Sequence, residues 1–164
     1  MRLKEMLTLF DYNCWANHRL LESASRVSQA QFLQSSSITG RSLRGTLIHT
    51  LRAEWTWRLR CQGVPLPALP TEEDFPTVEA LRARWVEEED AMRSLLKGLG
   101  PRDMDRLVSY KDLRGNSYQN VLWQVLLHVV NHGTQTRSEA ATLLTQFGQS
   151  PGDMDFILFL RQAT

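Results

Sequence analysis

The sequence predicts an all-α fold: a four-helix bundle with a crossover connection and a small extended excursion before the last long helix. Apolar residues recur at steps of three and four in four long segments, which is the period of an amphipathic helix. A proline-rich stretch separates the second segment from the third. With 164 residues the chain is long enough for one sizeable core, so we expect a single domain over residues 1–164.

The first half of the chain predicts two long helices and one short helix. Residues 2–24 carry one apolar stripe, formed by Leu3, Leu7, Phe10, Cys14, Asn17 and Leu21. A short helix is expected in SQAQFLQ, where Ser28 has the side chain of an N-cap. The second long helix, in SLRGTLIHTLRAEWTWRLRCQG, ends at Gly63, because glycine commonly stops helices.

The second half predicts a rigid connection, a third helix, the excursion and a fourth helix. VPLPALP is not helical, because proline lacks the backbone donor. Thr77 caps the third helix, which the GLGP of residues 98–101 closes. DRLVSYKDLRGNSYQ suits a small hairpin, and residues 119–147 form one helix of the kind found in the middle of a bundle. The tail DMDFILFLRQ is expected to pack on the bundle or on another subunit, which favours a homodimer.

The charge balance excludes several classes of partner. Lys and Arg number 19 against 18 Asp and Glu, so no global field favours nucleic acid or a membrane surface. Glu5 and Asp11 interrupt the apolar pattern at the N-terminus, so we expect no signal peptide and a cytoplasmic protein. Cys14 and Cys61 lack metal-like or redox-like spacing and are expected as ordinary buried thiols. Function must therefore come from a local site.

Two histidines four residues apart, His128 and His132, interrupt the apolar run LLHVVNH. On a helix they lie about 40° apart in projection, so both rings can face one cation. The pair alone also occurs by chance, and a single buried histidine is more often a hydrogen-bonded core residue. A third histidine, His49, is the stronger signal. Its helix face is made of small residues: Gly45, Thr46, Ala53 and Thr56.

Three neutral imidazoles around one point occupy three positions of a divalent ion and leave the rest open, as in a catalytic site. We therefore predict that His49, His128 and His132 bind a metal. Three nitrogen ligands suit zinc, nickel, copper or ferrous iron, and the order of affinities alone does not decide between them. His18 is expected as a partly exposed residue rather than a ligand. Asn131 precedes His132 and points about 100° away from it, and Glu54 lies five positions after His49, so neither is a strong ligand candidate.

Three stretches resemble the DinB/YfiT-like family: FDYNCWANHRLLESA, LRGTLIHTLRAEWTWRLRCQG and LLHVVNHGTQTRSEAATLLTQFG. The most specific part is a mid-helix histidine in the second stretch combined with HVVNH in the last. The resemblance implies a four-helix bundle, often dimeric, with nickel or zinc held by residues matching His49, His128 and His132. It also implies relatives that act as transferases or isomerases on glutathione, mycothiol or bacillithiol.

The chain departs from that family just after the ligands. Relatives commonly continue into a segment like HGTHHRGQ, whereas this chain reads HGTQTRSE. Arg137 is common to both, and the change leaves the three histidines intact. It removes any proton shuttle and any specific substrate that the resemblance would otherwise imply, so the catalytic residues stay unassigned.

Other polar and aromatic residues have a structural and a functional interpretation. Asn13 and Asn17 either orient a metal ligand or, more commonly, hydrogen-bond between helices. The acidic run of residues 87–90 is expected to be a solvated helix face. The five tryptophans are assigned to packing. Three residues of the excursion are candidates for the mouth of a substrate site: Tyr110, Tyr118 and Arg114.

Two functions remain open. In the first, a metal-dependent enzyme binds a low-molecular-weight thiol, stabilises its thiolate and transfers the sulfur to an electrophilic small molecule. In the second, a non-catalytic, stress-related module binds a metal or another ligand. The open coordination position favours the enzyme.

Overall fold

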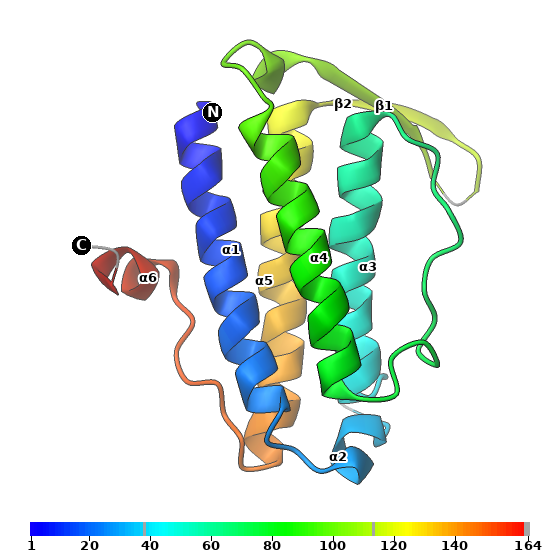
Figure 1. Ribbon diagram of the computed structural model, residues 1–164, viewed down its shortest axis with the longest axis vertical. Helices are drawn as coiled ribbons and strands as arrows, with labels where there is room; N and C mark the ends of the chain where they lie inside the picture. Colours follow the sequence, from blue (N-terminus) through cyan, green and yellow to red (C-terminus); the bar gives the residue numbers. More distant parts are fainter. Residues whose placement is uncertain (38, 113, 163–164) are drawn as a thin grey trace.

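Four long helices lie side by side along the longest axis of the computed structural model (Figure 1), which describes residues 1–37, 39–112 and 114–162. Their bounds are α1 (Leu3–Ala24), α3 (Leu43–Gln62), α4 (Val78–Lys97) and α5 (Leu122–Gln146). Two short helices, α2 (Gln29–Leu33) and α6 (Phe156–Gln162), and a 3-10 turn at Asp103–Asp105 complete the helical elements of the described residues. The prediction of a mainly helical chain is confirmed.

The helix ends follow local chemistry as the sequence predicts. The side chain of Ser28 accepts a hydrogen bond from the backbone N–H of Gln31, and Thr77 does the same for Ala80. Gly63 ends α3 with φ at 69°, in the left-handed region that favours glycine. These three predicted boundaries are confirmed.

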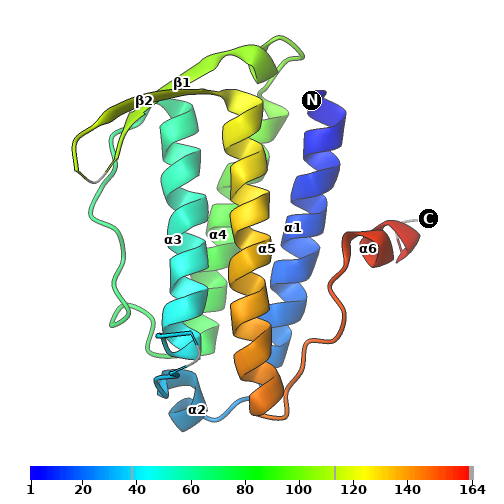
Figure 2. The same ribbon diagram turned by 180° about the vertical axis from the view of Figure 1, so that it is seen from behind.

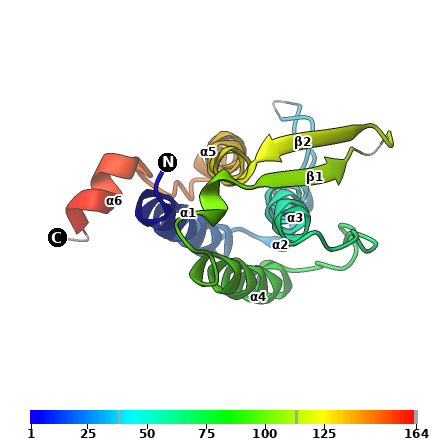
Figure 3. The same ribbon diagram turned by 90° about the horizontal axis from the view of Figure 1, so that it is seen from above.

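The long helices surround one interior. Helix α5 packs against both α1 and α3, and α4 also packs against both α1 and α3, as the view along the axes shows (Figure 3). Helices α3 and α4 run in the same direction, so the segment 63–77 between them returns along the length of the molecule (Figures 1 and 2). None of the described helices combines the length and apolar composition that crossing a membrane requires.

The excursion is a two-stranded antiparallel hairpin that lies across one end of α3 and α5 (Figures 1 and 3). Strand β1 (Leu107–Lys111) pairs with β2 (Ser117–Val121), with Tyr110 opposite Tyr118. Residue 113, within the predicted excursion, lies outside the described residues. Because residues 119–121 pair with β1, α5 begins at Leu122, and the predicted helix start at 119 is wrong.

The buried apolar side chains form two clusters along the helices. One contains Phe10 of α1 and Val130 of α5, and the other contains Leu20 of α1 and Ala140 of α5. The predicted stripe of α1 is largely buried, but Leu7 is exposed. Met6 takes the core position instead, because a period of 3.6 residues does not keep every fourth residue on one face.

Candidate functional site

The three predicted histidines come together between α3 and α5. His49 lies in the middle of α3, while His128 and His132 lie one turn apart in the first half of α5. The ring centroids of His49 and His132 are 5.1 Å apart, and those of His128 and His132 are 5.8 Å apart. His132 therefore contacts both of the other rings.

Each of these two separations is compatible with a pair of nitrogen donors on one ion. A zinc–nitrogen bond of about 2.0–2.1 Å in a tetrahedral site places imidazole centroids about 5 Å apart. As the side chains stand, however, no group of three or more His, Cys, Asp or Glu residues is arranged to hold a metal ion in residues 1–37, 39–112 and 114–162. The rings have suitable spacing, and common coordination would require them to turn about their side-chain bonds.

The histidines differ in exposure and share the direction of their pKa shifts. His128 is exposed, whereas His49 and His132 are half-buried. Burial lowers the pKa of all three rings. The pKa of His132 falls to about 4, because burial is reinforced by the nearby rings of His49 and His128. At neutral pH the three imidazoles are therefore uncharged, which is the form that binds metals.

A hydroxyl pair joins the two helices next to the histidines. Thr50 follows His49, and its hydroxyl donates to the hydroxyl oxygen of Thr136 at 2.8 Å. Thr136 in turn donates to the backbone carbonyl of His132 at 3.1 Å. Both threonines are buried, so this link holds α3 and α5 together at the level of the candidate site.

A layer of buried polar side chains crosses the interior one turn further along. One carboxylate oxygen of Glu54 accepts hydrogen bonds from the amides of Asn13, at 2.7 Å, and Asn17, at 3.0 Å, and its other oxygen accepts from the indole of Trp85. Arg137 donates to both asparagine carbonyls, at 2.6 and 2.9 Å. The layer thus connects all four long helices, and helix-to-helix hydrogen bonding is the role the structure gives the two asparagines.

The sequence reasoning missed this layer. At its centre Glu54 is a buried carboxylate whose pKa is raised, because burial outweighs its hydrogen bonds. Glu54 is the one acidic residue of α3 (Leu43–Gln62), and this is the signal that could have found it. Gly133 gives Arg137 its room, because a Cβ there would meet the Asn13 carbonyl oxygen at 2.8 Å and the Arg137 guanidinium at 2.9 Å.

The prediction of a solvated acidic face at residues 87–90 is wrong in part. Glu88 is completely buried and pairs with Arg58, while Glu89 is largely covered and bonds His18 at 2.8 Å. Successive helical residues point about 100° apart, so adjacent acids reach different surroundings. His18 is exposed, as predicted, and takes no part in the histidine group.

Comparison with known proteins places the chain in a family. All of it, residues 1–164, matches the DinB family. The chain belongs to the DinB family. Among its relatives, Protein DinB of Bacillus subtilis (strain 168) is 24% identical over 162 residues, which cover 93% of this chain and 91% of the relative.

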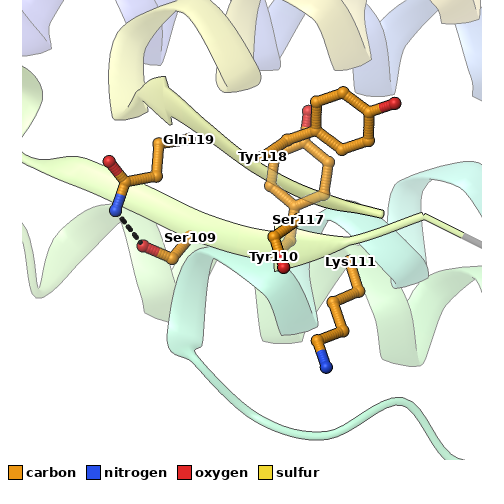
Figure 4. Close-up of a pocket in the computed structure, with 6 residues that line it drawn as sticks. All are labelled: Ser109, Tyr110, Lys111, Ser117, Tyr118 and Gln119. Atoms are coloured by element: carbon orange, nitrogen blue, oxygen red, sulfur yellow. Dashed lines mark hydrogen bonds between the residues drawn. The ribbon is translucent and has the colours of Figure 1, made fainter. Parts of the chain in front are cut away.

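In this DinB-family chain, an aromatic group adjoins the exposed end of the histidine group. The ring of Trp57, two turns beyond His49, meets His128 at 5.1 Å and Tyr110 at 5.0 Å, both nearly edge-on. Tyr110 stacks on Tyr118 across the hairpin at 5.9 Å, and Figure 4 shows the two rings side by side.

The hairpin residues that were predicted to line a substrate mouth divide into two groups. Tyr110 lines a pocket together with His128 and also lines a second pocket on the hairpin itself, whereas Tyr118 lines only the second of these two (Figure 4). Arg114 is exposed in the turn between the strands. The contact of Trp57 with His128 was not predicted, because tryptophans in sequence give no sign of which ring they will meet.

Proposed function

We propose that this DinB-family protein is a metal-dependent enzyme in which His49, His128 and His132 share one divalent ion, zinc or nickel. We also propose that its four long helices form a four-helix bundle, the architecture that builds metal sites from side chains on facing helices. The observation that carries the proposal is the contact of the His132 ring with the rings of both His49 and His128, three neutral imidazoles from two packed helices.

We propose transfer of a low-molecular-weight thiol to an electrophile as the reaction. The ion, when bound, would supply the positive charge that lowers the pKa of a coordinated thiol. The three rings would provide neutral donors and leave coordination positions open for that thiol. In the transfer, the thiolate sulfur forms a bond to the electrophilic carbon, the leaving group departs with its bonding pair, and the thiol proton goes to solvent.

The exposure of His128 supports an open rather than a closed site. A structural ion is normally enclosed by four protein ligands, whereas here one of three candidate ligands is exposed and adjoins a pocket. The Thr50–Thr136 hydrogen bond would keep the two ligand-bearing helices at a constant spacing while substrates exchange.

The test uses protein purified without added metal and without a histidine tag. Glutathione, mycothiol and bacillithiol are each supplied with 1-chloro-2,4-dinitrobenzene, and thioether formation is followed by absorbance. We expect transfer that a chelator abolishes and one metal restores, with His18→Ala active and His132→Ala inactive. A metal that raises the melting temperature while no thiol is transferred would contradict the enzyme and leave a non-catalytic ion-binding protein.

We also propose that the protein is a homodimer. Helix α6 lies beside α1 at the edge of the molecule and exposes Phe156, Ile157 and Leu160. Such an apolar face is commonly covered by another subunit. Light scattering at tens of micromolar should give twice the chain mass of 18.9 kDa, and a single chain mass would contradict the dimer.

A further inference from the structure

A pocket of about 250 Å³ opens beside His128. It lies between the C-terminal half of α3, the hairpin and the first turns of α5. Its lining residues are Trp57, Tyr110, Asn120, Gln124, Val125 and His128. We propose that this pocket binds one uncharged aromatic ring that carries an oxygen acceptor such as a nitro or carbonyl group. The assignment of this ring to the electrophilic substrate rests on the proposed function. The binding of the ring in the pocket does not depend on that function.

The volume suits a single ring. A cavity of about 150 Å³ is enough to admit benzene, and drug-sized ligands occupy about 300 to 1,000 Å³. A pocket of about 250 Å³ lies between these limits. It therefore has room for a substituted benzene and is too small for a large polycyclic ligand.

The walls are aromatic and meet at steep angles. The plane of Trp57 lies at 80° to that of Tyr110 and at 73° to that of His128. Aromatic rings favour edge-to-face and offset contacts, so walls at right angles offer a guest ring both kinds of contact. The guanidinium of Arg60 lies over the rings of Trp57 and Tyr110, at 4.5 and 4.7 Å, and its N–H donates to the backbone carbonyl of Lys111. The two walls are therefore held in place before any ligand arrives.

Two side-chain amides, those of Asn120 and Gln124, contribute to the polar lining. The Asn120 carbonyl oxygen accepts from the Tyr110 hydroxyl at 2.8 Å, and the Gln124 carbonyl oxygen accepts from the backbone N–H of Val121. Within the described part of the chain, the amide nitrogens of Asn120 and Gln124 form no hydrogen bond. They remain as donors for a ligand oxygen.

The lining also excludes charged ligands. Asp, Glu, Lys and Arg are absent from the pocket lining. An ionised ligand would lose its hydration without gaining a partner of opposite charge. A ring in this pocket would contact His128, which the proposed function makes one of the three ligands of the ion.

The binding test uses two alcohols of similar size. Isothermal titration calorimetry compares 4-nitrobenzyl alcohol with cyclohexylmethanol on the full chain, with chelator present and with zinc present. We expect the aromatic alcohol to bind about three- to tenfold more tightly, the range that aromatic contacts contribute. In labelled protein the ring signals of His128 should move on binding, while those of His18 should not.

Variants locate the binding. Trp57→Leu should weaken the binding of the aromatic alcohol by about three- to tenfold, whereas Trp57→Phe should keep its affinity within about twofold. Trp15→Leu is remote from the pocket and should leave the affinity unchanged. Circular dichroism shows whether each variant is folded, and Tyr110→Leu serves as a second pocket variant if Trp57→Leu is not. Equal binding of both alcohols, or full affinity in a folded leucine variant of Trp57 or Tyr110, would overturn the proposal. If the chelated protein binds the aromatic alcohol and no thiol transfer is found in the activity test, the pocket proposal stands and only the proposed enzyme activity is rejected.

Discussion

The guanidinium of Arg58 on α3 holds the carboxylate of Glu88 on α4 through two hydrogen bonds, of which the one from Nη2 to Oε2 is 2.8 Å long. The carboxylate is completely buried and the Arg58 side chain is 10% exposed. The pKa of Glu88 is raised, because burial outweighs the hydrogen bonds and charge of Arg58, which lower it. The pair therefore fixes the position of α4 against the helix that carries His49.

Replacing Glu88 by alanine should destabilise the fold strongly, because it leaves the Arg58 charge buried without its partner. Breaking such a pair costs about 3–5 kcal/mol in the free energy of unfolding. Urea denaturation measures this value. Glu87→Ala is the matched control, since the Glu87 side chain is 71% exposed and should change stability by less than about 0.5 kcal/mol. Equal effects of the two substitutions would contradict the buried pair.

Replacing the Glu54 carboxylate by the amide of glutamine should destabilise the fold. In Glu54→Gln the side chain keeps its shape, but its new NH₂ group must face a donor: the Asn13 amide, the Asn17 amide or the Trp85 indole. The same substitution removes the negative charge that faces Arg137 across the asparagines. We expect a loss of about 2–4 kcal/mol in the free energy of unfolding, measured in urea. A change below about 0.5 kcal/mol would show that the layer contributes little.

The parts of this fold that depend on neighbours in sequence could be predicted. Ser28, Gly63 and Thr77 mark helix ends because caps act within one turn. The start of α5 could not be read in the same way. Residues 119–121 directly precede the apolar run of the helix, but their pairing with a strand ten or more residues earlier decides their conformation.

In the candidate site, too, features set within one helix could be predicted and contacts between helices could not. The helical period places His128 and His132 on one face, and the small neighbours of His49 predict a space in front of it. The partner of a buried charge cannot be read from its own helix. Glu88 meets an arginine 30 positions earlier, and Arg137 meets an asparagine 124 positions earlier. These contacts depend on which helices pack together, which periodicity alone does not determine.

Stability should fall in acid as His132 becomes protonated on unfolding. Its pKa is about 4 in the folded chain, because of burial, and near 6.5 in the unfolded chain. The stabilisation that neutral His132 contributes is fully present above pH 6.5. It is lost as the pH falls from 6.5 towards 4, because in this range the unfolded chain binds the proton and the folded chain does not. Urea denaturation across this range, with chelator present, should give a shallower decline for His132→Asn than for the wild type.

His18 provides a control of opposite sign. Its hydrogen bond to Glu89 raises its pKa above 6.5, so its contribution is present below pH 6.5 and is lost as the pH rises through the higher folded pKa. The side chain is more than half exposed, so the effect should be small.

Parallel pH profiles for the wild type and His132→Asn would contradict a buried, neutral His132.

The metal content of single-histidine variants tests the central claim most directly. The chain has four histidines, so His18→Ala is the matched control for His49→Ala, His128→Ala and His132→Ala. After loading with zinc and dialysis, elemental analysis should find about one ion per chain in the wild type and in His18→Ala, as expected for one shared site. Each of the other three variants should lose most of the ion, and the double variant of His49 and His128 should be little worse than either single, because the sites are coupled. Full retention of zinc in a folded His49→Ala would contradict the shared site.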